Sequence, residues 1–376
     1  MTGRERFLAA LARRQPDRVP VWELIVNEPT LSAFGARDAD TFAEAADLDA
    51  VTVFESMPRT ALPPEEAAAF RLRGGAAASG NLALARDEWG IVWGTAADGE
   101  SYPLAGPVDS RAALAAYRPP DPAAPWRLDP VRKAVRHHGG RRAVVFCAHD
   151  GFEFAHYLRG GMEPLFEDWI EDPGFALDLA EVVIGYKIDL MQRAIAAGAD
   201  AVVSGDDYAG GTGPMMSPAH FRTFVLPFLK RSVAAAHAAG VPFIKHTDGN
   251  LWPIMDDLLA AGMDALDPLE PKAGMDLGEV KRRIGGRVAL VGNVDCSSLL
   301  ATGTKQEVED AVKETLAKGA PGGGFVLASS NTIHPGVKPE NYRTMLAVGR
   351  EHGRYPLDPA LVRDYAGRDY MARRRT

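Results

Sequence analysis

Residues 199–204 read ADAVVS, residues 218–239 have the spacing of an amphipathic helix, and residues 241–246 read VPFIKH. The first and last of these runs are short and rich in β-forming residues, and a longer helical pattern separates them. Alternating strands and helices imply parallel strands with helices packed outside them. This stretch therefore predicts one strand–helix–strand unit of an α/β fold.

The same alternation recurs along the chain. Candidate strands are residues 19–26, 50–54, 143–148, 199–204, 241–246, 265–269, 288–293 and 325–329. Candidate helices are residues 173–197, 218–239, 251–261, 277–284, 305–318 and 339–351. Eight such units close into a (β/α)8 TIM barrel. An open doubly wound sheet is the alternative, but no Gly-x-Gly-x-x-Gly motif follows an early strand, which disfavours a dinucleotide-binding fold.

Residues 56–140 interrupt the alternation. They contain several prolines, the glycine-rich stretch at 74–80 and the sequence WGIVWG at 89–94, which is typical of a short hairpin. A barrel with insertions can exceed roughly 400 residues, so the length does not require a second domain. We expect residues 1–376 to form a single domain, with 56–140 inserted between the second and third strands as a rim or lid.

Composition excludes several classes of protein. The chain is 46% hydrophobic and 24% charged, has a net charge of −8 and contains two cysteines, Cys147 and Cys296. These values indicate a folded core, disfavour a nucleic-acid partner and exclude a disulfide framework. No segment offers the ~18 consecutive apolar residues of a membrane helix, and residues 1–14 do not resemble a signal peptide. We expect a cytoplasmic protein without membrane association.

In a barrel of this kind, catalytic groups gather where the strands run out into the following loops. The polar residues at those positions are Glu55, His149, Asp150, Asp206, Asp207, Tyr208, His246, Asp248, Glu270, Asn293, Asp295, Ser330, Asn331 and His334. We expect catalytic roles for Asp206, Asp207, His246 and His334. We expect contacts with substrate from Glu55, His149, Tyr208, Asn293, Ser330 and Asn331.

Asp206 and Asp207 are adjacent at the end of one strand. Neighbouring strand residues face opposite ways, so we expect only one of the two carboxylates to point into the barrel mouth. Two carboxylates near one another raise the pKa of one, which suits general acid catalysis. The alternative is that one of them caps a loop or the next helix.

His246 and Asp248 lie two residues apart at a strand end, so both side chains can face the same side. Both residue types are metal ligands or proton-transfer groups. In the alternative interpretation, Asp248 or Asn250 caps the helix that begins near Leu251, and His246 is only hydrogen-bonded in place.

The loop after the last strand, residues 329–336, reads SSNTIHPG and follows a glycine run at 322–324. Polar, glycine-containing loops at this position of a barrel often hold anionic ligands, although such a loop can also be a turn that satisfies its own backbone. Cys147 lies within an apolar strand, and we interpret it as a core residue.

Several ordered motifs resemble the uroporphyrinogen decarboxylase superfamily. They are GDD at 205–207, GPMMSP at 213–218, FRTFVLP at 221–227, HTDGN at 246–250, GNVD at 292–295 and NTIHPGVKPENY at 331–342. The resemblance covers roughly residues 145–350 and implies a TIM barrel. It implies one of two chemistries: cofactor-independent decarboxylation of tetrapyrrole acetate groups, or zinc-assisted methyl transfer involving a corrinoid.

The sequence departs from both branches of this superfamily. The decarboxylases carry an arginine-rich motif, Met-Arg-Gln-Ala-Gly-Arg, that holds substrate carboxylates, whereas residues 23–28 here read ELIVNE. Glutamates in place of arginines would repel a polycarboxylate. The methyltransferases bind zinc through His-x-Cys and a later cysteine, whereas this chain has His246-x-Asp248 and, later, His334. Imidazole and carboxylate also bind zinc, so we expect His246, Asp248 and His334 as possible metal ligands.

Three functions follow as hypotheses. The first is metal-assisted methyl transfer of the O-demethylation type between a small molecule and a corrinoid, which a partner protein would carry. The second is a cofactor-independent decarboxylase acting on a carboxylate substrate, with Asp206 or Asp207 and His334 handling protons. The third is a non-catalytic binding barrel. The resemblance also implies a homodimer.

Overall fold

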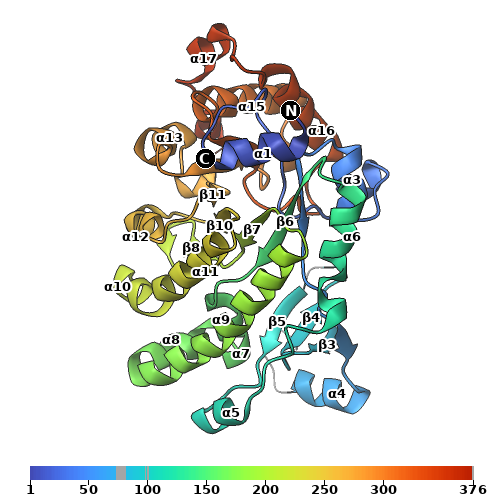
Figure 1. Ribbon diagram of the computed structural model, residues 1–376, viewed down its shortest axis with the longest axis vertical. Coiled ribbons are helices and arrows are strands. Elements are labelled where there is room, and N and C mark those ends of the chain that lie inside the picture. Colours follow the sequence, from blue (N-terminus) through green and yellow to red (C-terminus); the bar gives the residue numbers. More distant parts are fainter. Residues whose placement is uncertain (73–81, 98, 100, 375–376) are drawn as a thin grey trace.

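The computed structural model describes residues 1–72, 82–97, 99 and 101–374. Its centre is a seven-stranded parallel sheet in the order β1-β6-β7-β10-β11-β12-β13 (Figure 1). The strands are β1 (Ala50–Val53), β6 (Ala143–Ala148), β7 (Ala201–Ser204), β10 (Phe243–His246), β11 (Ala265–Asp267), β12 (Ala289–Val294) and β13 (Phe325–Ser329). Seven of the eight predicted strands are thereby confirmed. The fold is of the α/β class and resembles a TIM barrel.

Helices connect these strands in sequence and pack around the sheet. They include α6 (Asp129–His138), α7 (Phe152–Arg159), α8 (Met162–Glu171), α9 (Pro173–Ala196), α11 (Leu226–Ala238), α12 (Met255–Ala260), α13 (Leu277–Ile284), α15 (Lys305–Gly319) and α16 (Pro339–His352). Helices α9 and α11 begin after Asp172 and Val225 and carry proline in their first turn, where no backbone donor is lost. Among the described residues, no helix is long and apolar enough to cross a membrane.

Side chains alternate between two cores along the central strands. One core gathers small residues on one face of the sheet, and helix α1 (Gly3–Leu11) adds Phe7 and Leu11 to it. Its strand residues include Val145, Cys147, Val203, Ile244, Val291 and Val326. The intervening residues join the larger core under the helices, as Val144, Phe146, Val202 and Phe243 do. This period of two separates an inner face, which α1 covers, from a helix-covered outer face.

The predicted first strand, residues 19–26, is extended but is not a regular strand. Leu327 N–H donates to Pro20 O at 2.9 Å, and Trp22 N–H donates to Leu327 O at 3.2 Å. On the other side, Asp49 N–H donates to Val21 O at 2.9 Å. Pro20 has no N–H to donate, which limits a regular ladder. The segment therefore bonds to β13 and to the start of β1, the two edge strands of the sheet.

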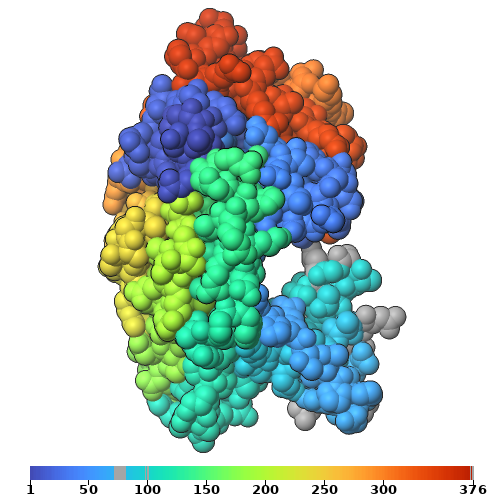
Figure 2. Space-filling view, turned by 45° about the vertical axis from the view of Figure 1, so that its right-hand side comes forward, coloured from blue at the N-terminus to red at the C-terminus, as the bar shows by residue number. Residues whose placement is uncertain are grey.

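Residues 56–140 contain more regular structure than the sequence predicted. An antiparallel sheet has the order β2-β3-β4-β5. Its elements are β2 (Arg59–Ala61), β3 (Ala83–Asp87), β4 (Val92–Thr95) and β5 (Ser101–Ala105), with helices α4 (Pro64–Leu72) and α5 (Arg111–Ala116) beside it. The predicted hairpin at 89–94 is the β3–β4 turn. The glycine-rich stretch at 74–80 lies outside the described residues. Figure 2 shows this unit projecting from the molecule.

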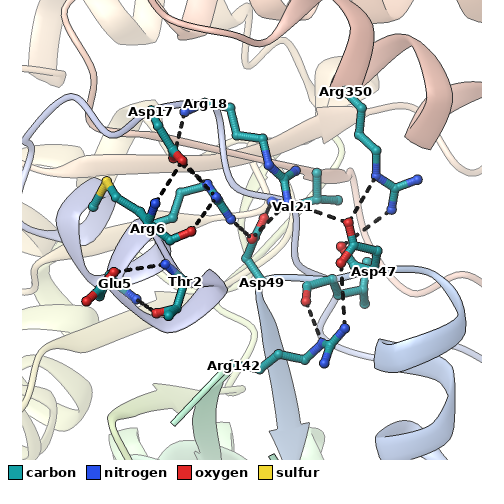
Figure 3. Close-up of polar contacts among 12 residues, drawn as sticks. Thr2, Glu5, Arg6, Asp17, Arg18, Val21, Asp47, Asp49, Arg142 and Arg350 are labelled. Atoms are coloured by element: carbon teal, nitrogen blue, oxygen red, sulfur yellow. Dashed lines mark hydrogen bonds and ion pairs between the residues drawn. The ribbon is translucent and has the colours of Figure 1, made fainter.

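A buried carboxylate, Asp49, ties the start of the chain to the central sheet (Figure 3). It accepts hydrogen bonds from Arg6 Nη1 at 2.5 Å, Val21 N at 2.8 Å and Arg18 Nη2 at 3.2 Å. Arg6 is itself buried and pairs with Asp17 as well. Neighbouring Asp47 is exposed, and its carboxylate oxygens lie 3.6–3.7 Å from the guanidinium nitrogens of Arg18, Arg142 and Arg350.

We expect Asp49→Asn to lower the free energy of unfolding by about 2 kcal/mol. The amide NH2 group is a donor, so it would face one of the N–H donors that now bond to a carboxylate oxygen. Asp47→Asn is the matched control, and its effect should stay below about 1 kcal/mol because exposed pairs contribute little. Urea unfolding measures both values. Equal losses in the two variants would show that Asp49 is not a special anchor.

A second buried acid, Glu23, lies beside β13. It is 5% exposed, and Ser329 donates to it from Oγ at 2.6 Å and from N at 3.1 Å. Burial raises the pKa of Glu23 to about 8, although the hydrogen bonds from Ser329 act in the opposite direction. The folded chain therefore favours the neutral acid at this position.

The folded pKa of Glu23 lies above the usual unfolded value, so its contribution to stability is complete below about pH 4.5 and is lost as the pH rises towards about 8. We expect Glu23→Gln to remove this loss and to be more stable than the wild type at pH 8.5 by on the order of 3 kcal/mol. Thermal unfolding at pH 5 and pH 8.5 measures the difference. The exposed Glu28→Gln is the control, and parallel pH profiles for all three proteins would contradict the assignment.

Candidate functional site

Three predicted site residues meet where β7 and β10 end. His246 is the last residue of β10, and its Nε2 lies 3.7 Å from Asp248 Oδ1 and 4.0 Å from Asp207 Oδ1. One ligand atom from each of Asp207, His246 and Asp248 lies within 4.8 Å of the other two. We call these three residues the central group. Asp207 is also held by Asp248 N–H, which donates to its Oδ1 at 2.9 Å.

Register between two strands fixes the orientation of His246. β10 and β11 pair so that His246 lies opposite Asp267, the last residue of β11. The His246 Nδ1 and Asp267 Oδ2 are 2.5 Å apart. A carboxylate on one ring nitrogen fixes the tautomer and turns the other nitrogen towards Asp207 and Asp248. Burial lowers the pKa of His246, but the hydrogen bond and charge of Asp267 outweigh it and raise this pKa to about 9.

Asp248 uses one oxygen in a hydrogen bond, and its other oxygen lies 3.7 Å from His246 Nε2 without a hydrogen bond. Asn331 Nδ2 donates to its Oδ2, whereas its Oδ1 is buried and has no hydrogen bond. Burial, and then the charge of Asp207, raise the pKa of Asp248 to about 7. An unpartnered buried carboxylate oxygen is unfavourable unless a proton or a cation reaches it.

The central group fits a zinc-type cation. It offers one imidazole and two carboxylates, which are ordinary zinc ligands. The carboxylate of Asp267 behind the histidine is the outer partner usual at such sites, and Asn331 orients one ligand in the same way. The unpartnered Oδ1 of Asp248 points to the same conclusion.

Asp206 has a different environment from its neighbour Asp207. It is fully buried and accepts hydrogen bonds from four consecutive backbone N–H groups, those of residues 150–153, at 2.8–3.2 Å. His149 Nδ1 lies 2.8 Å from its Oδ1 and 3.0 Å from Glu153 Oε2. Burial opposes ionisation, yet the bond and charge of His149 hold the pKa of Asp206 well below its usual range. Asp206 anchors the start of α7, as the capping alternative predicted for one of the pair.

His149 lies beside the barrel mouth as a second protonatable group. Burial lowers its pKa, but the hydrogen bonds to Asp206 and Glu153 raise it to about 9. Together His149, Glu153 and Asp206 form a second cluster of potential ligands. Because Asp206 is already saturated by backbone donors, this cluster fits a cation less well than the central group does.

The structure does not bring His334 into the central group. Gly336 N–H donates to its Nδ1 at 3.1 Å, and its Nε2 lies 3.2 Å from Cys296 O. Both ring nitrogens are therefore occupied by backbone groups, one from the same loop and one from the loop that follows β12. The sequence predicted His246, Asp248 and His334 as the possible metal ligands. In the described part of the chain, the third residue beside His246 and Asp248 is Asp207.

Four residues predicted to contact substrate have hydrogen-bond partners within the protein. Glu55 binds Tyr186, Lys187 and Arg127 at 2.7–3.1 Å. Tyr208 is fully buried, with its hydroxyl 2.5 Å from Asp150. The buried Asn293 donates to the carbonyls of Leu269 and Met275, and the buried Ser330 accepts from Cys296 N. Buried polar groups at the ends of strands need such partners. Asn331, by contrast, reaches Asp248.

Sequence reasoning missed two residues near the site. Asp267 was counted only as part of a strand, although an aspartate at the end of an apolar run was a usable signal. Lys245 is fully buried, and its Nζ lies 2.8 Å from Asp150 Oδ2 and 3.2 Å from Ser204 Oγ. Lys245 and His246 are neighbours on β10, so their side chains point to opposite faces of the sheet. The ion pair of Lys245 with Asp150 therefore lies on the helix-covered face, where it joins the ends of the strands.

Comparisons with known proteins agree with this architecture. The family model for uroporphyrinogen decarboxylase (URO-D) matches residues 96–352. A uroporphyrinogen decarboxylase from Thioalkalivibrio sulfidiphilus is 30% identical over 66% of this chain and 71% of its own length. One from Idiomarina loihiensis is 27% identical over 90% of this chain and 92% of its own.

A solved structure of a methyltransferase from Methanosarcina mazei has a TM-score of 0.72 to this chain at 20% sequence identity. The match covers 93% of this chain and 99% of the methyltransferase chain, so the fold is shared over nearly the whole length. The sequence match and the shared fold together show that this chain belongs to the uroporphyrinogen decarboxylase family, whose superfamily includes a methyltransferase branch.

Proposed function

We propose that this chain is a metal-assisted methyltransferase, which removes a methyl group from an oxygen of a small molecule and passes it to a corrinoid held by a partner protein. The observation that carries the proposal is the central group with the unpartnered Oδ1 of Asp248. A cofactor-independent decarboxylase has no need of three converging ligands backed by Asp267.

The charge around the central group supports the same choice. Asp207, Asp248 and Asp267 surround His246. Glu270 lies close by and accepts a hydrogen bond from Gly249 N–H at 3.2 Å. Within the described ranges, no lysine or arginine pairs with these three aspartates. Such a site attracts a cation and repels a substrate with several carboxylates.

Each residue then has a defined task. Asp207, His246 and Asp248 would hold the metal, which when bound supplies a Lewis acid that polarises the substrate oxygen. Asp267 holds the His246 tautomer, and Asn331 turns Asp248 so that its second oxygen stays available. His149, which is bonded to two carboxylates, would supply a proton to the oxygen that loses its methyl group.

The alternative is a decarboxylase without a metal, and the names of the curated relatives favour it. Its proton-transfer residues would have been Asp206 or Asp207 and His334. In the structure Asp206 is saturated by backbone donors and both nitrogens of His334 are bonded. Asp207 is left as the available group, which weakens this alternative.

We expect purified wild-type protein supplied with zinc to retain metal, and the variant His246→Ala/Asp248→Ala to lose one equivalent per chain. Removing two of three ligands leaves too few donors to hold the ion. Inductively coupled plasma mass spectrometry after gel filtration measures the stoichiometry. Wild-type zinc content unchanged by the double substitution would remove the basis for the proposal.

The reaction is tested on the same two proteins. Methyl-ether substrates are supplied with free cobalamin reduced to the Co(I) state under anaerobic conditions, because Co(I) provides the electron pair that takes the methyl group. Methylcobalamin is followed by its absorbance, and carbon dioxide release from carboxylate substrates is measured in parallel. Methyl transfer by the wild type and its loss in the variant support the proposal. Carbon dioxide release that does not depend on metal supports the decarboxylase instead, and turnover in neither assay favours a binding barrel.

We expect Asp267→Asn to weaken zinc binding roughly 10- to 100-fold, because outer partners of ligating histidines have effects of that size. The control is Asp189→Asn, which makes the same chemical change in an exposed pair with Arg193 on α9. Competition with a zinc indicator dye gives both affinities. Equal affinities in the two variants would mean that Asp267 does not orient His246 towards a metal.

A further inference from the structure

A separate group of potential ligands joins two helices at the other end of the sheet. Glu44 lies in α3 (Ala39–Ala45), and His137 and His138 are the last two residues of α6. One ligand atom from each of the three lies within 4.8 Å of the others. Helix α6 ends shortly before β6 begins, so this group lies near the amino ends of the strands. The central group lies at their carboxyl ends.

His138 is fully buried and has an unused nitrogen. Its Nε2 lies 3.1 Å from Asp40 Oδ1, one turn before Glu44 on α3. Its Nδ1 is buried and has no hydrogen-bond partner. When a carboxylate takes the N–H of one ring nitrogen, the other nitrogen carries a lone pair, which is the form that binds metals. A buried lone pair without a donor calls for a ligand.

His137 and Glu44 complete the group at the surface. The His137 Nε2 lies 3.2 Å from Glu44 Oε1, and each side chain is a little more than one-third exposed. Arg141 Nη2 lies 3.5 Å from the same glutamate oxygen, but its hydrogen bonds go to the carbonyl oxygens of His137 and His138 at the end of α6. The side chains of Glu44 and His137 are partly exposed, so they can turn towards an ion without disturbing the core.

We propose that Glu44, His137 and His138 bind a divalent transition-metal ion such as Zn²⁺, Ni²⁺ or Cu²⁺, separate from the central group. Two imidazoles and one carboxylate suit these ions, whereas Mg²⁺ and Ca²⁺ require more oxygen ligands. Solvent supplies the remaining position. The bound ion links α3 to α6, so it stabilises the contact between two elements that are far apart in sequence but packed together.

The test uses the full-length His246→Ala/Asp248→Ala protein, in which the central group is disabled. Zn²⁺ alone is titrated by isothermal calorimetry, and Cu²⁺ alone is examined by electron paramagnetic resonance. We expect one remaining equivalent of bound metal, a copper spectrum with nitrogen couplings and a higher Tm in the presence of Zn²⁺. Adding Glu44→Gln and His137→Ala should abolish all three signals. Buried His138 is left unchanged so that the fold is kept.

His237→Ala is the matched control, because His237 is an exposed histidine paired with a single carboxylate, Asp264. It should leave metal binding unchanged. Absence of any zinc binding in the His246→Ala/Asp248→Ala protein overturns the proposal, as does binding that persists after Glu44→Gln and His137→Ala. A wild type whose zinc is lost only with Glu44 and His137 supports this site while removing the proposed catalytic one, so the two failures are distinguishable.

Discussion

The period of two along parallel strands is the constraint from which the rest of this structure follows. Each strand residue faces either the inner core, which α1 covers, or the layer under the helices. Because β10 and β11 are in register, His246 and Asp267 face each other at the same level. The preceding residue on β10, Lys245, faces the other way, and for that reason it enters a buried ion pair under the helices and not the site.

The adjacent aspartates show the same constraint acting on charge. Asp206 turns to the backbone donors at the start of α7, where the helix dipole and four N–H groups stabilise its negative charge. Asp207 has no such donors from a helix and turns to His246 and Asp248. One strand end thereby provides both a permanent anion that builds the scaffold and a second carboxylate that is free to bind a ligand.

Buried ionisable groups distinguish this chain from a barrel that only binds a ligand by shape. Glu23, His149, His246 and Asp248 all have raised pKa values, and each is held by specific partners. Burying charge is unfavourable unless pairing offsets it, so clusters of this kind point to chemistry or to a bound ion. Acidic residues also stand at positions 23 and 28, where the decarboxylase motif carries arginines, and three aspartates surround His246.

The sequence by itself determined the alternation of strands and helices, seven of the strands, the family and the pairing of His246 with Asp248. These features depend on local spacing and motifs, and His246 and Asp248 stand two residues apart at the point where β10 ends. Only the tertiary structure decided that Asp207 and not His334 completes the central group, that Asp267 orients the histidine, and that Glu55 and Tyr208 are structural. Those choices depend on strand register and on which loop satisfies its own backbone, and both are set by partners far away in the chain.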